Sequence, residues 1–165
     1  MMNHKGFTLI ELVMVLVLIG ILAVFAAPRL GDISTIKADA FVDKLRSEIR
    51  YAQNLAMSQN RRYRVYFNTA PAPNPGYAVV NDANGNGTWG EAGEIARDPA
   101  GSGNLNVTLN AGEYAGITVS TPVGGFIEFT SLGAPTVGGG AAITVFANLV
   151  AAGTMTITAQ TGAVN

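Results

Sequence analysis

The strongest constraint on this chain is a nearly unbroken apolar run close to its start. Residues 7–27 read FTLIELVMVLVLIGILAVFAA, and Glu11 is the one charged side chain among them. In an α-helix this run rises about 30 Å, which matches the hydrocarbon core of a bilayer. The sequence therefore predicts a membrane-spanning helix over residues 7–28, preceded by a leader at residues 1–6.

The residues that flank the apolar run predict its orientation. Lys5 favours a cytoplasmic N-terminus, which places the rest of the chain on the far side of the membrane. An ordinary secretory signal peptide is the alternative, because Val24-Phe25-Ala26 offers a small-residue cleavage pattern. Glu11 argues against a signal peptide, since an ionised carboxylate in an apolar segment is costly to insert and normally marks a functional partner.

The start of the run, Gly6-Phe7-Thr8-Leu9-Ile10-Glu11-Leu12, resembles the cleavage and methylation motif of type IV pilins and type II secretion pseudopilins. The resemblance implies that a prepilin peptidase cuts between Gly6 and Phe7 and that the new amino group of Phe7 is N-methylated. It also implies that Glu11 meets the charged amine of Phe7 from a neighbouring subunit during assembly. Pro28 stands where such proteins often carry a helix-kinking proline.

A second, amphipathic helix is predicted over residues 29–59. Its apolar residues recur at spacings of three, four or eight on one face, which is predicted to pack on a sheet. They are Ile33, Phe41, Leu45, Ile49, Ala52 and Ala56. The charged residues of this helix are predicted to form a solvated surface, and they are Asp39, Asp43, Lys44, Arg46, Glu48 and Arg50.

Short alternating segments follow, separated by clusters of Gly, Pro, Asn and Ser that are typical of an antiparallel sheet with loops. Strands are predicted at residues 63–67, 77–80, 105–109, 117–120, 126–130, 143–146 and 155–158. The predicted fold class is α+β, in which a long N-terminal helix packs its second half on an antiparallel β-sheet domain at residues 60–165. This architecture is also that of the pilin family.

Shorter stretches resemble the GspH, FimT and MSHA-type minor pilins: residues 45–56 with 64–67, residues 129–135 and residues 161–164. The resemblance implies a minor subunit of a type IV pilus or type II secretion pseudopilus. Its β-sheet domain is expected in the periplasm of a bacterium, and its partners are the prepilin peptidase, other pilin subunits and the inner membrane. The alternative is a filament-borne binding module for adhesion or DNA uptake.

Composition argues against catalysis. The chain has no cysteine, and its one histidine, His4, falls in the predicted leader. Disulfides, thiolate metal sites and histidine-based catalysis are therefore excluded for the mature protein. We predict a structural protein without catalytic residues, small-molecule substrate or required cofactor.

One loop places oxygen-bearing side chains at alternate positions and a glycine at the sixth, as calcium loops do. The residues are Asp82, Asn84, Asn86, Thr88, Glu91 and Glu94. The twelfth position is Gly93 rather than glutamate, and a glycine-rich turn explains most of the same residues. Calcium binding and a structural turn are thus the two hypotheses.

Trp89 is predicted to plug this loop onto the domain, with ligand contact as the alternative.

Arg61, Arg62 and Arg64 form the densest basic cluster, which suggests contact with DNA phosphates or acidic neighbours. Strand alternation is expected to put Arg61 and Arg62 on opposite faces. In the resembled group, DNA-binding pilins are understood to use arginines in a terminal Gly-Arg motif, whereas this tail reads TGAVN. With a net charge of −1 as well, we predict that DNA is not a partner and that the cluster is a solvated edge.

Overall fold

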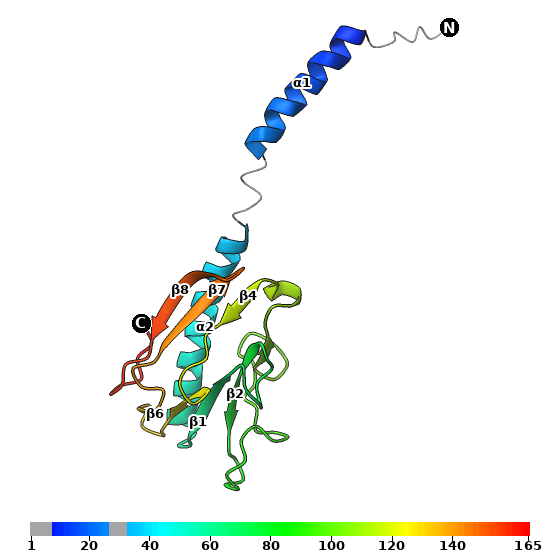
Figure 1. The fold of residues 1–165 in the computed structure, drawn as a ribbon. Helices are drawn as coiled ribbons and strands as arrows, with labels where there is room; N and C mark the ends of the chain where they lie inside the picture. The colour runs from blue at the N-terminus through cyan, green and yellow to red at the C-terminus, as the bar shows by residue number, and fades with distance from the viewer. Residues whose placement is uncertain (1–7, 27–32) are drawn as a thin grey trace. The chain divides into compact units, whose positions relative to one another are not determined.

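A computed structural model describes residues 8–26 and 33–165 (Figure 1). The helices are α1 (Leu9–Ala26) and α2 (Ile33–Ser58), with a short 3₁₀ helix, η2, at Gly112–Tyr114. The strands are β1 (Tyr63–Phe67), β2 (Gly76–Asn81), β3 (Asn106–Thr108), β4 (Ile117–Val119), β5 (Phe126–Phe129), β6 (Pro135–Val137), β7 (Ala142–Ala147) and β8 (Val150–Thr156). The chain divides into two compact units, Met1–Ser34 and Thr35–Asn165.

The first unit contains α1, which begins directly after Thr8. The carbonyl of Thr8 accepts hydrogen bonds from the backbone N–H of Glu11 at 3.1 Å and of Leu12 at 3.2 Å. Threonine is a favourable N-cap residue, because its side-chain oxygen also accepts from the first turn, here from Glu11 N–H at 3.4 Å.

Across the described ranges 8–26 and 33–165, no helix combines the length and the apolar character that a membrane crossing requires. The predicted span over residues 7–28 is therefore not confirmed.

The second unit holds two antiparallel sheets. Five strands form one sheet in the order β3-β2-β1-β5-β6, and three form the other in the order β4-β7-β8. In the central strand β1, Val65 pairs with Val79 of β2 and with Ile127 of β5. All three side chains are buried, so this register places one apolar face of the larger sheet toward the core.

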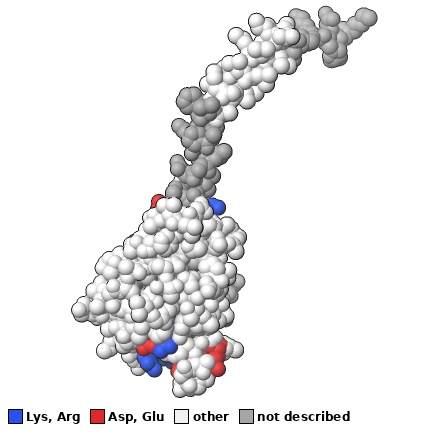
Figure 2. All heavy atoms as spheres, viewed as in Figure 1, with Lys and Arg blue, Asp and Glu red and all other residues white. Residues whose placement is uncertain are grey.

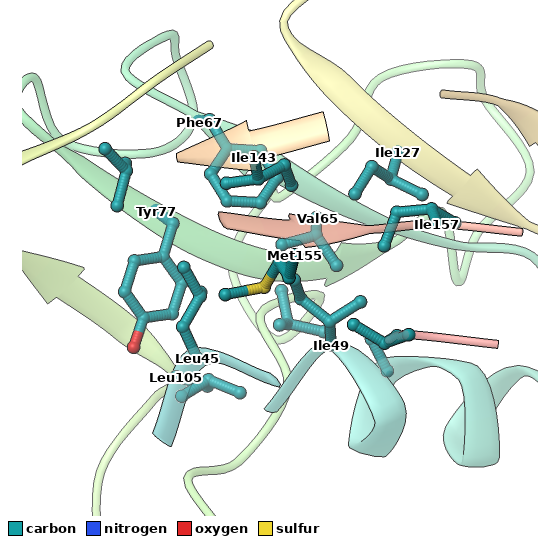
Figure 3. Packing of buried hydrophobic residues seen from close by; sticks show 14 of the residues in the cluster. Leu45, Ile49, Val65, Phe67, Tyr77, Leu105, Ile127, Ile143, Met155 and Ile157 are labelled. Carbon is teal, nitrogen blue, oxygen red and sulfur yellow. The ribbon is translucent and has the colours of Figure 1, made fainter. Parts of the chain in front are cut away.

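The hydrophobic core lies where α2 meets the two sheets (Figure 3). Phe41, Leu45, Ile49, Ala52 and Ala56 of α2 are buried, as the periodicity predicts. In Figure 3, Leu45 and Ile49 lie beside side chains from both sheets, which include Val65, Tyr77 and Met155. The α+β class and the packing of the second helix on a β-sheet domain are therefore confirmed, whereas the side chain of Ile33 lies outside the described ones.

Most predicted strands are present. The predictions at residues 63–67, 77–80, 105–109, 117–120, 126–130 and 143–146 match β1, β2, β3, β4, β5 and β7 within two residues at each end. Five of these segments are largely buried or alternate buried with half-buried side chains, whereas the segment at residues 105–109 is buried only at its two ends. Most of their apolar pattern is therefore visible in the sequence.

One strand was missed, and the bounds of another prediction are wrong. The strand β6 was not predicted, because it is short and begins with Pro135, a residue that normally indicates a loop. The predicted strand at 155–158 actually begins earlier, as β8 at Val150. Its first four residues, Val150-Ala151-Ala152-Gly153, are two exposed residues followed by two half-buried ones, so they lack the alternation that identifies a half-buried strand.

The C-terminal residues are fastened to α2. Arg50 Nη2 donates to the carbonyl of Val164 at 2.6 Å, and Gln53 Nε2 donates to the carbonyls of Thr161 at 2.7 Å and Gly133 at 2.8 Å. We call these three hydrogen bonds from Arg50 and Gln53 the C-terminal clamp. Gly162 lies next to the clamped carbonyls and has a φ of +69°. A Cβ at this position would be 2.6 Å from the Gly133 carbonyl oxygen. Only glycine fits this position without displacing backbone.

We expect Gly162→Ala to lower the free energy of unfolding by more than about 2 kcal/mol, because it combines a strained φ with backbone overlap. Gly85→Ala is the matched control, since Gly85 has a φ of +74° but nothing within 4 Å of the added carbon; its expected loss is about 1 kcal/mol. Urea unfolding of the two variants measures the difference. Equal losses would contradict the clamp.

Candidate functional site

Helix α1 carries the first group of candidate residues. Glu11 lies in its first turn, where the positive end of the helix dipole favours a carboxylate. The side chains of residues 9–23 are all exposed although nearly all are apolar. A helix that is apolar on every side is stable when it is surrounded by lipid or by other helices. The predicted cleavage residues Gly6 and Phe7, and Pro28, lie outside the described residues.

Glu94 holds the predicted calcium loop in place. Its side chain is buried, with 4% exposed. One carboxylate oxygen accepts the backbone N–H of Ala83 at 2.8 Å and of Asn84 at 3.3 Å, and the other accepts the N–H of Glu91 at 3.2 Å. Three backbone donors on one carboxylate tie the two ends of the loop together.

The other predicted ligands of the loop contact each other and its backbone. Asp82 accepts the N–H of Asn86 at 3.1 Å and of Gly87 at 3.0 Å. The side-chain amides of Asn84 and Asn86 donate to Glu91 Oε2 at 2.8 and 2.9 Å. Thr88 joins through its backbone N–H, which donates to Asn86 Oδ1 at 2.7 Å. These bonds support the hypothesis of a structural turn.

The structure thus brings the six predicted calcium ligands into one loop. In the part of the chain that the structure describes, no group of three or more His, Cys, Asp or Glu is arranged to hold a metal ion. That search covers only His, Cys, Asp and Glu, whereas three of the six predicted ligands are asparagine or threonine. Calcium binding therefore stays a prediction.

Trp89 fastens the loop to the outer face of the larger sheet. This face carries a second apolar cluster, formed by Tyr66, Ala72, Ala78 and Val80 with Trp89, Ile95 and Phe126 packed against it. The guanidinium carbon of Arg64 lies 3.8 Å from the centre of the Trp89 ring and 4.3 Å from that of Phe126. The prediction that Trp89 plugs the loop onto the domain is confirmed.

Glu128 binds two arginines of the predicted basic cluster, Arg62 and Arg64. It is buried, with 4% exposed, and accepts from Arg64 Nε at 2.6 Å, Arg62 Nη1 at 3.3 Å and Thr136 Oγ1 at 2.9 Å. Burial acts to raise the pKa of Glu128, but the hydrogen bonds from Arg64 and Thr136 and the charge of both arginines lower it below its ordinary value.

This arrangement changes the interpretation of the basic cluster. Arg62 and Arg64 meet the same buried acid, while Arg61 is exposed and precedes β1. On the face of the domain shown in Figure 2, basic and acidic atoms lie close together in a group at the lower left, and a second group at the lower right is acidic. Two of the three predicted arginines therefore have an intramolecular partner, and the expectation that DNA is not a partner stays a prediction.

The sequence did not identify Glu128 as a partner of these arginines. The signal was present in the register, since Arg64 and Glu128 are directly opposite each other on β1 and β5. Strand pairing is a long-range feature, however, and neither segment reveals its neighbour.

One charged residue of α2, Glu48, does not lie on the solvated surface that the sequence predicts for it. Glu48 is buried and accepts hydrogen bonds from Lys44 Nζ and from the Tyr77 hydroxyl. Burial raises the pKa of Tyr77, and the negative charge of Glu48 raises it further. Tyr77 comes from β2, so the prediction for Glu48 was wrong because its partner arrives from a distant strand.

We expect Glu128→Gln to lower the free energy of unfolding at pH 7 by about 2 kcal/mol, because Arg64 loses a charged partner. A lowered folded-state pKa stabilises the protein above the ordinary pKa of glutamate, near 4.5, and this stabilisation is lost as pH falls through the folded-state pKa. The variant should therefore lose less stability than the wild type between pH 6 and about pH 3.

Chemical denaturation across that pH range tests the expectation, with Glu113→Gln as the control because Glu113 is an exposed acid. A variant with the same acid dependence as the wild type would show that the Arg64 contact contributes nothing to folding.

Comparison with known families gives two matches. Residues 42–163 match the family described as type II transport protein GspH. Residues 1–27 match the prokaryotic N-terminal methylation motif. The two matched regions together cover most of the chain.

Individual proteins show more limited similarity. The type IV narrow pilus major component PilA5 of Thermus thermophilus is 45% identical over 58 residues, which are 35% of this chain and 50% of PilA5. The matched region therefore spans only half the length of that relative. Two crystal structures of the type IV minor pilin FimU from Pseudomonas aeruginosa PAO1 give TM-scores of 0.49 and 0.48 at 15% identity. They cover 78% and 77% of this chain and 86% and 90% of FimU.

Proposed function

We propose that this chain, which belongs to the family of type II transport protein GspH, is a prepilin cut after Gly6, methylated at Phe7 and assembled as a minor pilin or pseudopilin subunit. The finished filament is a type IV pilus or a type II secretion pseudopilus. The match of residues 1–27 to the prokaryotic N-terminal methylation motif supports the processing step.

The observation that carries the proposal is the contrast between α1 and the rest of the chain. The unit Thr35–Asn165 has a core that covers Phe41, Leu45 and Ile49 of α2. Helix α1 exposes its apolar side chains at residues 9–23 instead. Such a surface needs lipid or neighbouring helices to cover it. In this proposal α1 is surrounded by membrane lipid before assembly and by the helices of other subunits afterwards.

In this proposal the precursor is a single-pass protein of the bacterial inner membrane with its C-terminal domain in the periplasm. Lys5, on the leader side of the apolar run, supports that orientation. The prepilin peptidase and other pilin or pseudopilin subunits are its partners. The chain has no catalytic task of its own.

Glu11 supplies the specificity of assembly. Its carboxylate, one turn into α1, pairs with the methylated amino group of Phe7 on a neighbouring subunit. Lipid tails and helix side chains are similarly apolar, so apolar contact alone gives little preference for the filament over the membrane. An ion pair that forms only between subunits provides that preference.

The alternative, a filament-borne module for adhesion or DNA uptake, has less support. Its DNA version depended on the basic cluster, in which Arg64 is largely covered by its contact with Glu128 and Arg62, still 60% exposed, meets the same carboxylate. The proposed role is therefore structural.

Intact-mass analysis after co-expression with a prepilin peptidase tests the processing step. We expect the loss of residues 1–6 and the gain of one methyl group, because the cut exposes the amino group of Phe7. Gly6→Leu should abolish both changes, since a bulky side chain before the cut blocks the peptidase pocket, whereas Asn3→Leu in the same leader should be processed normally. Cleavage near Ala26 would refute the proposal in favour of a secretory signal.

A second test separates processing from assembly. We expect Glu11→Gln to be cleaved and methylated normally but to enter filaments roughly tenfold less, or worse, because removing one member of a buried ion pair is strongly destabilising. Quantitative immunoblotting of sheared filaments measures incorporation. The matched control is Glu113→Gln in the β-sheet domain. Normal incorporation of Glu11→Gln would show that the carboxylate does not guide assembly.

A further inference from the structure

An apolar, strained turn joins β7 to β8. Leu149 is 87% exposed and Val150 is 70% exposed. The turn residues Asn148 and Leu149 have φ values of +49° and +70°, as in the tight hairpin turns that favour Asn followed by Gly. Leucine has a Cβ that disfavours this left-handed conformation, so Leu149 keeps a strained backbone where glycine would relax it.

Contacts within the described chain do not explain why leucine occupies this position. Leu149 borders a shallow hollow with Asn110, Gly116, Thr118 and Asn148, which offers mainly polar or small neighbours. Its side chain nevertheless stays almost fully exposed. A strained residue that gains little inside the fold points to a contact outside it.

The turn lies at the end of the domain where α2 begins (Figure 1). Ala147, directly before the turn, pairs with Ile117 of β4. Ile117 in turn lines a cavity with Lys37 and Phe41 from the first turns of α2. Ile36, in the same part of α2, is exposed as well.

Chain length limits how far this end is from α1. Residues 27–32 separate Ala26, the last residue of α1, from Ile33, the first of α2. Even a fully extended connection of this length spans only about 25 Å. Whatever surrounds α1 therefore begins within that distance of the start of α2.

From these observations we propose that Leu149 and Val150 dip into the interfacial layer of the membrane that holds α1, so that the domain rests on the lipid surface before assembly. This inference rests on the proposed function, because it requires α1 to be a membrane anchor. Residues 147–154 read ANLVAAGT and contain no charged side chain, so insertion removes no charge from water.

A lipid surface suits this turn better than a protein partner. A stable protein interface normally buries more than about 1,000 Å², whereas two adjacent aliphatic side chains on a protruding turn cover only a small area. Lipid accepts such a small apolar tip without a complementary shape, and α1 already holds the chain to the membrane.

Site-specific fluorescence tests the contact, and the chain offers a clean background because it has no cysteine. The full-length precursor with Val150→Cys carries an environment-sensitive fluorophore and is reconstituted alone in phosphatidylethanolamine and phosphatidylglycerol vesicles with headgroup-nitroxide lipids. Leu132→Cys is the matched control, since Leu132 is 87% exposed in the turn before Gly133, which lies near Met57 at the end of α2.

We expect the label at position 150 to shift to the blue and to be quenched several-fold more than the label at position 132. Equal quenching at the two positions would overturn the proposal. It would also be overturned if the signal at position 150 changed only after other pilin subunits were added, because a neighbouring subunit would then be the partner. Peptidase cleavage of the same samples reports separately on the proposed function.

Leu149→Gly gives an independent readout. Relief of strain should raise the unfolding midpoint by about 3 °C, while quenching of the label at position 150 should fall. The same substitution at Leu132 should leave that quenching unchanged. A lower unfolding midpoint for Leu149→Gly would show that the side chain serves the fold itself and would overturn the inference.

Discussion

The structure of the domain depends on one helix face that packs on two separate sheets. Leu45, Ile49 and Ala52 of α2 have no exposed surface, and their neighbours come from the larger sheet and from β7 and β8. No strand of one sheet pairs with a strand of the other, so α2 and the shared apolar core supply most of the contact between them. The clamp of Arg50 and Gln53 on the C-terminal residues extends the same role of α2 to the end of the chain.

The domain uses many of its charged side chains internally. Glu128 pairs with Arg62 and Arg64, Glu48 pairs with Lys44, and Glu94 holds a loop through its backbone. The chain has no cysteine and its one histidine is His4. Buried acids are therefore the groups in the domain that one would first consider for binding or catalysis. In the structure these groups are engaged in contacts within the domain.

The sequence predicted the features that depend on local periodicity. The buried face of α2 repeats every three or four residues, and β1 and β5 have dense apolar patterns, so each was recognisable without knowledge of its neighbours. The sequence did not predict the beginning of β8, whose first residues show no alternation of buried and exposed side chains, or the burial of Glu48. That burial depends on Tyr77, which lies 29 positions away along the chain, and no local pattern encodes such a meeting. The leader and the cleavage site were predicted from a family resemblance instead, and both stay predictions.

Under the proposed function, stability and assembly are separated along the chain. The domain gains its folding energy from the α2 core, which buries apolar surface whether or not a filament forms. Helix α1 has apolar surface that lipid and neighbouring helices cover almost equally well, so moving from the membrane to a filament changes the hydrophobic contribution little. A small electrostatic term can then decide between the two environments, and Glu11 is the one charged side chain in α1. The proposed role of Glu11 follows from this near balance, because a single ion pair is large compared with the remaining difference between lipid and helix packing.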